Sequence, residues 1–111
     1  MKYFMNLQNS PFLNIKRGAK TIEMRLFDEK RQLLKVGDTI EFTNVVTSEK
    51  LNVKVIGLHK FKNFEDLYSH FDKSQLGYLE IENANPSDMK QYYRDEDIAK
   101  YGVLGIEIKR I

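Results

Sequence analysis

The chain has 111 residues, which is expected to give one domain over residues 1–111. Hydrophobic residues make up 41% of it, and this content is too high for a disordered chain. The absence of cysteine excludes a disulfide scaffold, a thiolate zinc site and a cysteine nucleophile.

The formal net charge is +2, but the charges are unevenly distributed. Residues 16–35 contain seven basic and three acidic side chains, whereas residues 80–97 contain two basic and six acidic ones. A basic segment favours an anionic partner such as RNA or a nucleotide, although charged side chains also serve simply to solvate a surface.

Targeting and cofactor signals are missing from the sequence. The N-terminus turns polar too early for a signal peptide and no long apolar run follows, so a cytoplasmic protein without a membrane segment is expected. Only His59 and His70 are available as imidazole ligands, so no metal and no other cofactor is expected. The sequence does not indicate an oligomeric state.

The first elements are predicted from alternation and capping residues. Apolar and polar residues alternate over residues 3–7, which predicts a strand. Ser10 followed by Pro11 is typical of an N-cap and a first helical residue, so a short helix is expected to follow and to end at Gly18. A second strand is predicted over residues 21–27.

Later elements follow the same signals. The polar residues 28–32 predict a turn or a single helical turn. Asn63 is expected to cap a helix with Asp66 at its third position, and Asn85 with Pro86 to begin another. A helical turn is expected near residues 95–101. Three further strands are predicted at residues 40–42, 51–60 and 103–108.

About five strands and about three short helices in a chain of this length predict an α+β fold. We expect the antiparallel sheet to curl into a small barrel flanked by the helices. Both termini are predicted to be strands, and these two strands are expected to pair and help to close the barrel.

The densest group of polar residues lies in the second predicted strand and just before it. Lys20, Glu23 and Arg25 fall within a span of six residues that begins shortly after Gly18. Ile22, Met24 and Leu26 alternate with polar residues, so Thr21, Glu23 and Arg25 are expected on the face opposite to this apolar set. Polar groups held at fixed spacing on a rigid strand are suited to binding or catalysis, and we predict the functional site here.

This segment, Gly18-x-Lys20-x-x-Glu23-x-Arg25, resembles the GxKxxExR signature of the ASCH (activating-signal-cointegrator homology) domain family. Three further features agree with that resemblance over nearly the whole chain. They are the Gly37–Asp38 turn before a short strand, the aromatic-led helix at residues 64–67 and the C-terminal segment 101–107.

The resemblance implies a PUA-like β-barrel whose short helices flank a cleft, and a general role in binding RNA or nucleotides. Some small members resemble amidohydrolases that act on N(4)-acetylcytidine, and others act as ribonucleases. Lys20 matches the lysine that the deacetylating members use. Glu23 stands where those members have threonine, and Asp72 does not match their glutamate after the mid-chain helix.

Three interpretations of the charged residues remain open. In the first, Glu23 accepts hydrogen bonds from a ligand base while Lys20 and Arg25 contact phosphate. In the second, Glu23 and Arg25 form a purely structural pair. In the third, Lys20 and Glu23 share acid–base catalysis. A basic or nucleophilic Lys20 must be neutral, which a neighbouring carboxylate opposes.

Tyrosines are the next candidates for ligand contacts. Aromatic faces stack on nucleic-acid bases, and of Tyr92, Tyr93 and Tyr101 we expect one to line the cleft; Tyr93 and Tyr101 are the preferred candidates. Thr21 is a candidate ligand contact or hydroxyl nucleophile, although a strand threonine more commonly forms a local hydrogen bond.

The leading hypothesis is therefore a module that binds RNA, a nucleotide or a nucleoside in a basic cleft formed by Lys20, Thr21, Glu23 and Arg25. The alternative is a small metal-independent hydrolase, similar to an N(4)-acetylcytidine amidohydrolase or a ribonuclease, with Lys20 and Glu23 catalytic. A third hypothesis is a partner-binding domain that uses the acidic residues 80–97.

Overall fold

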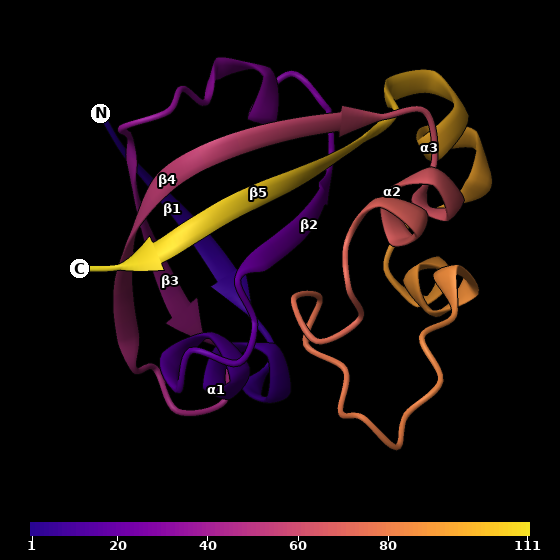
Figure 1. Ribbon diagram of the computed structural model, residues 1–111. Coiled ribbons are helices and arrows are strands. Elements are labelled where there is room, and N and C mark those ends of the chain that lie inside the picture. The colour runs from indigo at the N-terminus through magenta and orange to yellow at the C-terminus, as the bar shows by residue number, and fades with distance from the viewer.

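The computed structural model describes residues 1–111 and is built around one five-stranded sheet that curls into a half-barrel (Figure 1). The strands are β1 (Lys2–Leu7), β2 (Ile22–Leu26), β3 (Thr39–Asn44), β4 (Lys50–Phe61) and β5 (Val103–Arg110). The α-helices are α1 (Asn9–Lys16), α2 (Phe64–His70) and α3 (Asp95–Tyr101), and the 3-10 helices are η1 (Arg31–Leu33) and η2 (Pro86–Gln91). No helix is both long enough and apolar enough to span a bilayer.

The strand order is β1-β3-β4-β5-β2, with β1 parallel to β3 and every other pair antiparallel. The predicted α+β curled sheet is confirmed, but the predicted pairing of the terminal strands is wrong. Both edges of β5 are occupied, one by the long β4 and the other by β2, so β1 pairs with β3 instead. The strands β1 and β2 are therefore the two edges of the half-barrel.

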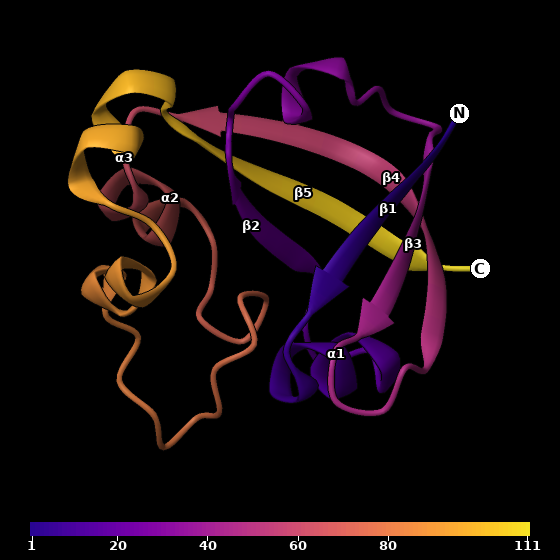
Figure 2. The ribbon, with the colours of Figure 1, turned by 180° about the vertical axis from the view of Figure 1, so that it is seen from behind.

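Two apolar clusters lie on opposite sides of β2. One fills the inside of the curl, where α1 contributes Phe12 and Ile15. The other joins the apolar residues of β2 to α2, η2 and the loop between them, and includes Met24 and Leu67. In Figures 1 and 2 the helices α2 and α3 lie to one side of the sheet, away from α1. A strand with a layer on each side buries its polar face as well, and Glu23 is only 3% exposed.

The predicted caps are largely confirmed. The side chain of Asn63 accepts a hydrogen bond from Asp66 N at 2.8 Å, and Asn85 caps η2. Gly18 ends the α1 segment with a φ of 79°, a conformation that favours glycine. The helix α1 begins at Asn9, two residues before Pro11, the predicted first helical residue, and it has no side-chain cap. The hydroxyl of Ser10 is therefore not used as the predicted N-cap.

Candidate ligand-binding pocket

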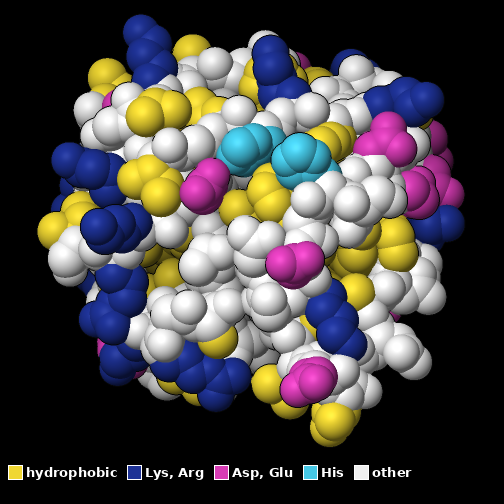
Figure 3. Space-filling view, viewed as in Figure 1, with side chains coloured by type: hydrophobic (Ala, Val, Ile, Leu, Met, Phe, Trp, Pro, Cys, Tyr) yellow, Lys and Arg dark blue, Asp and Glu magenta, His cyan; other side chains and the backbone are white.

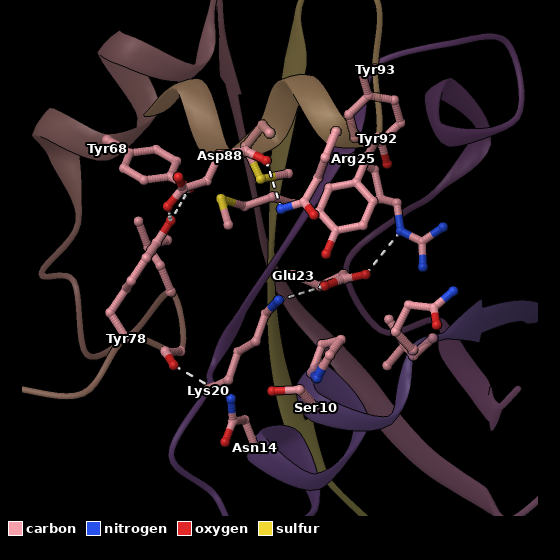
Figure 4. A pocket seen from close by; sticks show the side chains of 18 of the residues that line it. Ser10, Asn14, Lys20, Glu23, Arg25, Tyr68, Tyr78, Asp88, Tyr92 and Tyr93 are labelled. Atoms are coloured by element: carbon pink, nitrogen blue, oxygen red, sulfur yellow. Dashed lines mark hydrogen bonds and ion pairs between the residues drawn. The ribbon is translucent and has the colours of Figure 1, made fainter. Parts of the chain in front are cut away.

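A pocket of about 360 Å³ lies where the half-barrel meets the helical layer. One side of it is formed by α1, the end of β1 and β2, and the other by residues 68–93 (Figure 4). Figure 4 shows Lys20, Glu23 and Arg25 in a row, with Tyr92 and Tyr93 near the Arg25 end and Tyr78 near the Lys20 end. The sequence motif therefore forms one wall of an open pocket.

Glu23 is the centre of this wall and is held by two cations. Lys20 Nζ lies 3.0 Å from Glu23 Oε1, and Arg25 Nε donates to Glu23 Oε2 at 2.9 Å. The side chains of Lys20, Glu23 and Arg25 are 9%, 4% and 14% exposed. We call this group the charged triad. Because each oxygen of the carboxylate has its own partner, the carboxylate is fixed in one orientation.

Burial and ion pairing act in opposite directions on these groups. Burial by itself raises the pKa of Glu23, but the positive charges and hydrogen bonds of Lys20 and Arg25 outweigh it and hold that pKa below its usual value. Burial likewise lowers the pKa of Arg25, and the Glu23 carboxylate more than reverses this. The carboxylate is thus ionised at neutral pH.

Arg25 also links the two edges of the sheet. Its Nη2 donates to the main-chain oxygen of Asn6 on β1 at 2.9 Å, while its Nε is bonded to Glu23 on β2. The strands β1 and β2 do not pair with each other, so this guanidinium bridges the opening of the half-barrel. Arg25 therefore has a structural role whether or not it contacts a ligand.

The opposite wall is made of tyrosines. The hydroxyls of Tyr68 and Tyr78 lie 2.8 Å apart, and Tyr78 donates to Asp88 Oδ2 at 2.8 Å. Burial, followed by the hydrogen bonds to Tyr68 and Asp88, raises the pKa of Tyr78. Tyr93 stacks on Phe64 with a ring separation of 5.9 Å, whereas Tyr92 is 53% exposed. This wall offers neutral aromatic rings and hydroxyls.

The structure brings together most, but not all, of the predicted site residues. Lys20, Glu23, Arg25 and Tyr93 line the pocket. Thr21 and Tyr101 are not among its lining residues, and the Tyr101 hydroxyl donates to Glu29 Oε1 at 3.2 Å.

Several lining residues were not singled out from the sequence. They include Tyr68 on α2, Tyr78, Glu82 and Asp88. The segment that supplies Tyr78 and Glu82 has no periodic pattern, and Ser10 was assigned to a helix cap. Spacing along the chain contains no signal for Tyr78 and Glu82, because these two residues reach the pocket through the path of the loop after α2.

The charges of the lining do not form the expected basic cleft. Lys20 and Arg25 are the two cations, and Glu23, Glu82 and Asp88 supply three carboxylates. In Figure 3 the lysine and arginine side chains gather instead over the sheet on the side of the C-terminus, and acidic side chains gather at α3. The pocket is therefore a polar, aromatic site rather than a strongly basic one.

Comparison with known proteins places the chain in a family. The family model for the ASCH domain matches residues 5–111. The chain belongs to the ASCH domain family. The curled sheet and the flanking helices are therefore those of an ASCH domain, a PUA-like fold whose family-level role is RNA-binding or hydrolase-like. Among curated proteins no match was found.

Solved structures agree with this assignment. The crystal structure of the hypothetical protein PH0355 is 35% identical over the whole of both chains, with a TM-score of 0.85. The solution structure of protein PF0455 from Pyrococcus furiosus is 30% identical over 100% of this chain and 98% of that one, with a TM-score of 0.78. A mutant of ZmASCH from Zymomonas mobilis shares the fold at 12% identity and a TM-score of 0.69, over 96% of this chain and 66% of that one.

Proposed function

We propose that this ASCH domain binds a nucleoside unit, either within RNA or as a free nucleotide, in the pocket between the charged triad and the tyrosines. The observation that carries the proposal is the convergence of Lys20, Glu23 and Arg25 on an open pocket whose opposite wall is aromatic. The tyrosine rings suit the face of a base, and the fixed carboxylate and the hydroxyls suit the hydrogen-bonding groups of a base or ribose.

The size of the pocket supports a ligand of this class. A volume of about 360 Å³ lies at the lower end of the range of roughly 300–1,000 Å³ that is usual for small-molecule sites. Exposed tyrosine rings such as Tyr92 stack on bases, and a fixed carboxylate or hydroxyl accepts or donates hydrogen bonds at a base or ribose. Because carboxylates outnumber cations in the lining, the base and ribose suit the pocket better than the phosphate does.

Binding to a pool of short RNAs and to each of the four nucleoside monophosphates tests the proposal. We expect binding at low salt and a loss of affinity of roughly fivefold or more in Tyr92→Ala, because a base–aromatic stack contributes about 1–3 kcal/mol. Tyr101→Ala is the matched control, since it removes a tyrosine outside the pocket. The RNA pool and the free nucleotides distinguish the two sources of the nucleoside unit.

Arg25→Ala should also weaken binding, but its loss of the bond to Asn6 requires that folding be checked by thermal melting. Absence of binding at low salt to every ligand contradicts the proposal. Equal affinities of wild type, Tyr92→Ala and Arg25→Ala place any binding outside this pocket, which contradicts it as well.

A second candidate function, a metal-independent hydrolase, is favoured by one observation. The Lys20 ammonium is buried beside Glu23 and faces a pocket that two further carboxylates, Glu82 and Asp88, also line. An amine and carboxylates around one cavity are the groups that acid–base hydrolysis of an acylated nucleoside or RNA needs. Incubation with N(4)-acetylcytidine or RNA in the presence of a chelator tests it. We expect turnover to disappear in Lys20→Ala and to persist in Lys16→Ala, and turnover that survives Lys20→Ala removes Lys20 from the mechanism.

A further inference from the structure

The main chain of Met24 has a hydrogen-bonding edge that no other part of the protein uses. In an antiparallel pair, the residues of a strand alternate between bonding to the partner strand and pointing away from it. Phe27 N donates to Gly102 O at 3.0 Å, and Ile108 N donates to Thr21 O at 3.0 Å. Odd-numbered residues of β2 therefore bond to β5, and the N–H and C=O of Met24 point away from it.

The other contacts at these two sheet edges follow the same alternation. Leu7 O on β1 accepts from Val45 N at 2.9 Å, so Asn6 faces the free edge of β1, where its carbonyl receives Arg25. At the free edge of β2, Ile22 N donates to Gln75 O at 3.0 Å. Two residues further along β2, the N–H and C=O of Met24 point to the same free edge, and neither group has a partner.

Met24 is only 7% exposed and is one of the residues that line the pocket. Buried main-chain N–H and C=O groups in proteins are nearly always paired, because leaving one unpaired is costly. Since the protein supplies no partner at Met24, the groups available to pair with it are those that enter the pocket.

We propose that the N–H and C=O of Met24 bind the hydrogen-bonding edge of the ligand's nucleobase. One extended residue presents a donor and an acceptor on the same side, which matches a planar ring with an adjacent acceptor and donor, such as N1 and the amino group of adenine or O4 and N3–H of uracil. This inference rests on the proposed function, because it assigns the base of that nucleoside to the edge of β2. The charged triad then holds in place the edge of β2 that binds the base.

Methylated nucleosides test the contact without changing the protein. We expect 3-methyluridine, which lacks the N3–H donor, to bind at least roughly tenfold more weakly than uridine, because a buried acceptor loses its partner. The control 5-methyluridine keeps the donor and acceptor and should bind like uridine. For adenosine the same comparison uses N6,N6-dimethyladenosine against 8-methyladenosine.

The protein side of the contact is tested by two substitutions at one position. Met24→Pro removes the N–H, and proline is tolerated on an edge strand where the N–H faces away from the partner strand. We expect it to weaken binding at least roughly tenfold, whereas Met24→Leu, which keeps the main chain and a similar volume, should weaken binding much less than Met24→Pro does. Nuclear magnetic resonance of the wild type gives an independent readout: the Met24 amide proton should shift downfield and exchange more slowly when the nucleoside is added.

The outcomes separate this inference from the proposed function. If nucleotides bind and Tyr92→Ala weakens them, but edge methylation and the Met24 amide show no effect, the inference is overturned and the proposed function stands. If Met24→Pro does not fold, the methylated nucleosides and the amide signal of the wild type still decide. If no nucleotide binds, both are overturned.

Discussion

The two walls of the pocket differ in how they are held. The charged triad lies on and just before an edge strand, is nearly excluded from solvent, and is held by ion pairs between residues close in sequence. The tyrosine wall comes from α2, the loop after it and the residues that follow η2. The hydroxyls of Tyr68 and Tyr78 are joined by a hydrogen-bond chain that ends at the exposed Asp88. One wall is charged and nearly excluded from solvent, whereas the other is mainly aromatic and more accessible and has its carboxylates at Glu82 and Asp88.

This difference indicates that the two walls contribute differently to stability and to binding. Buried ions that lose their partner cost several kilocalories per mole, whereas hydroxyl bonds near the surface contribute little. Substitutions in the charged triad should therefore act first on folding, and substitutions among the tyrosines should act first on the ligand. The following changes test that division, from the largest expected effect to the smallest.

Glu23→Gln should give the largest effect. It leaves the ammonium of Lys20 and the guanidinium of Arg25 buried without a counter-charge, and we expect a loss of about 3–5 kcal/mol in the free energy of unfolding. Urea denaturation measures it. The control Glu82→Gln changes an exposed carboxylate of the same pocket and should stay within about 0.5 kcal/mol. Equal effects of the two substitutions would contradict a stabilising role of the charged triad.

The Glu23 carboxylate also makes the stability of the fold depend on pH. The folded-state pKa of Glu23 lies below its ordinary value of 4.5, so the unfolded state binds more protons between these two values. The stability contributed by Glu23 is thus fully present above pH 4.5 and is lost as the pH falls through the folded-state pKa. The difference in unfolding free energy between wild type and Glu23→Gln should shrink as the solution is acidified. A constant difference would mean that the pKa of Glu23 is not lowered.

Arg25→Lys should have the next largest effect. A lysine keeps the charge, but its single ammonium does not reproduce a planar fork that bonds both Glu23 and the carbonyl of Asn6. We expect a loss of about 1.5–3 kcal/mol in the unfolding free energy, the usual value of a hydrogen bond to a charged group. Faster amide exchange at β1 and β2 than in wild type would locate the effect at the opening of the half-barrel, and an unchanged stability would argue against the bridge.

Tyr78→Phe removes one hydroxyl that bonds both Tyr68 and Asp88. We expect a loss of about 1 kcal/mol in stability, smaller than either change in the charged triad, and a measurable loss of nucleotide affinity. Tyr92→Phe is the matched control because the Tyr92 ring stays exposed and keeps its stacking face. A stability loss as large as that of Glu23→Gln would remove the distinction between the walls.

Tyr101→Phe should have the smallest effect. Its hydroxyl donates to Glu29 at 3.2 Å outside the pocket, so we expect stability within about 0.5 kcal/mol of wild type and unchanged nucleotide affinity. Tyr93→Phe, inside the pocket, is the paired measurement. A larger loss of affinity in Tyr101→Phe than in Tyr93→Phe would indicate that the ligand binds near α3 and not in the pocket.

Local signals in the sequence anticipated much of this molecule. Alternation located the strands, Asn63 and Asn85 located helix starts, and the spacing of Lys20, Glu23 and Arg25 located one wall of the pocket. These features succeed because they depend on residues a few positions apart, where backbone geometry alone determines which side chains are neighbours.

Other features could not be predicted from such short-range signals. The expected pairing of the terminal strands was wrong because the choice of partner depends on which sheet edges are already occupied. The tyrosine wall was not anticipated because Tyr68 and Tyr78 meet through a loop without periodicity. The expected basic cleft did not appear in the lining because folding brings Glu82 and Asp88 to the same cavity.

The sequence by itself determined the fold class, the ASCH resemblance and the charged motif, since each is written in short-range patterns of residue type. Only the tertiary structure decided that the motif is a buried, mutually paired charged triad, that tyrosines face it, and that the edge of β2 at Met24 is left without a partner. These depend on the packing of a second layer against β2, and burial is a property of the folded chain as a whole.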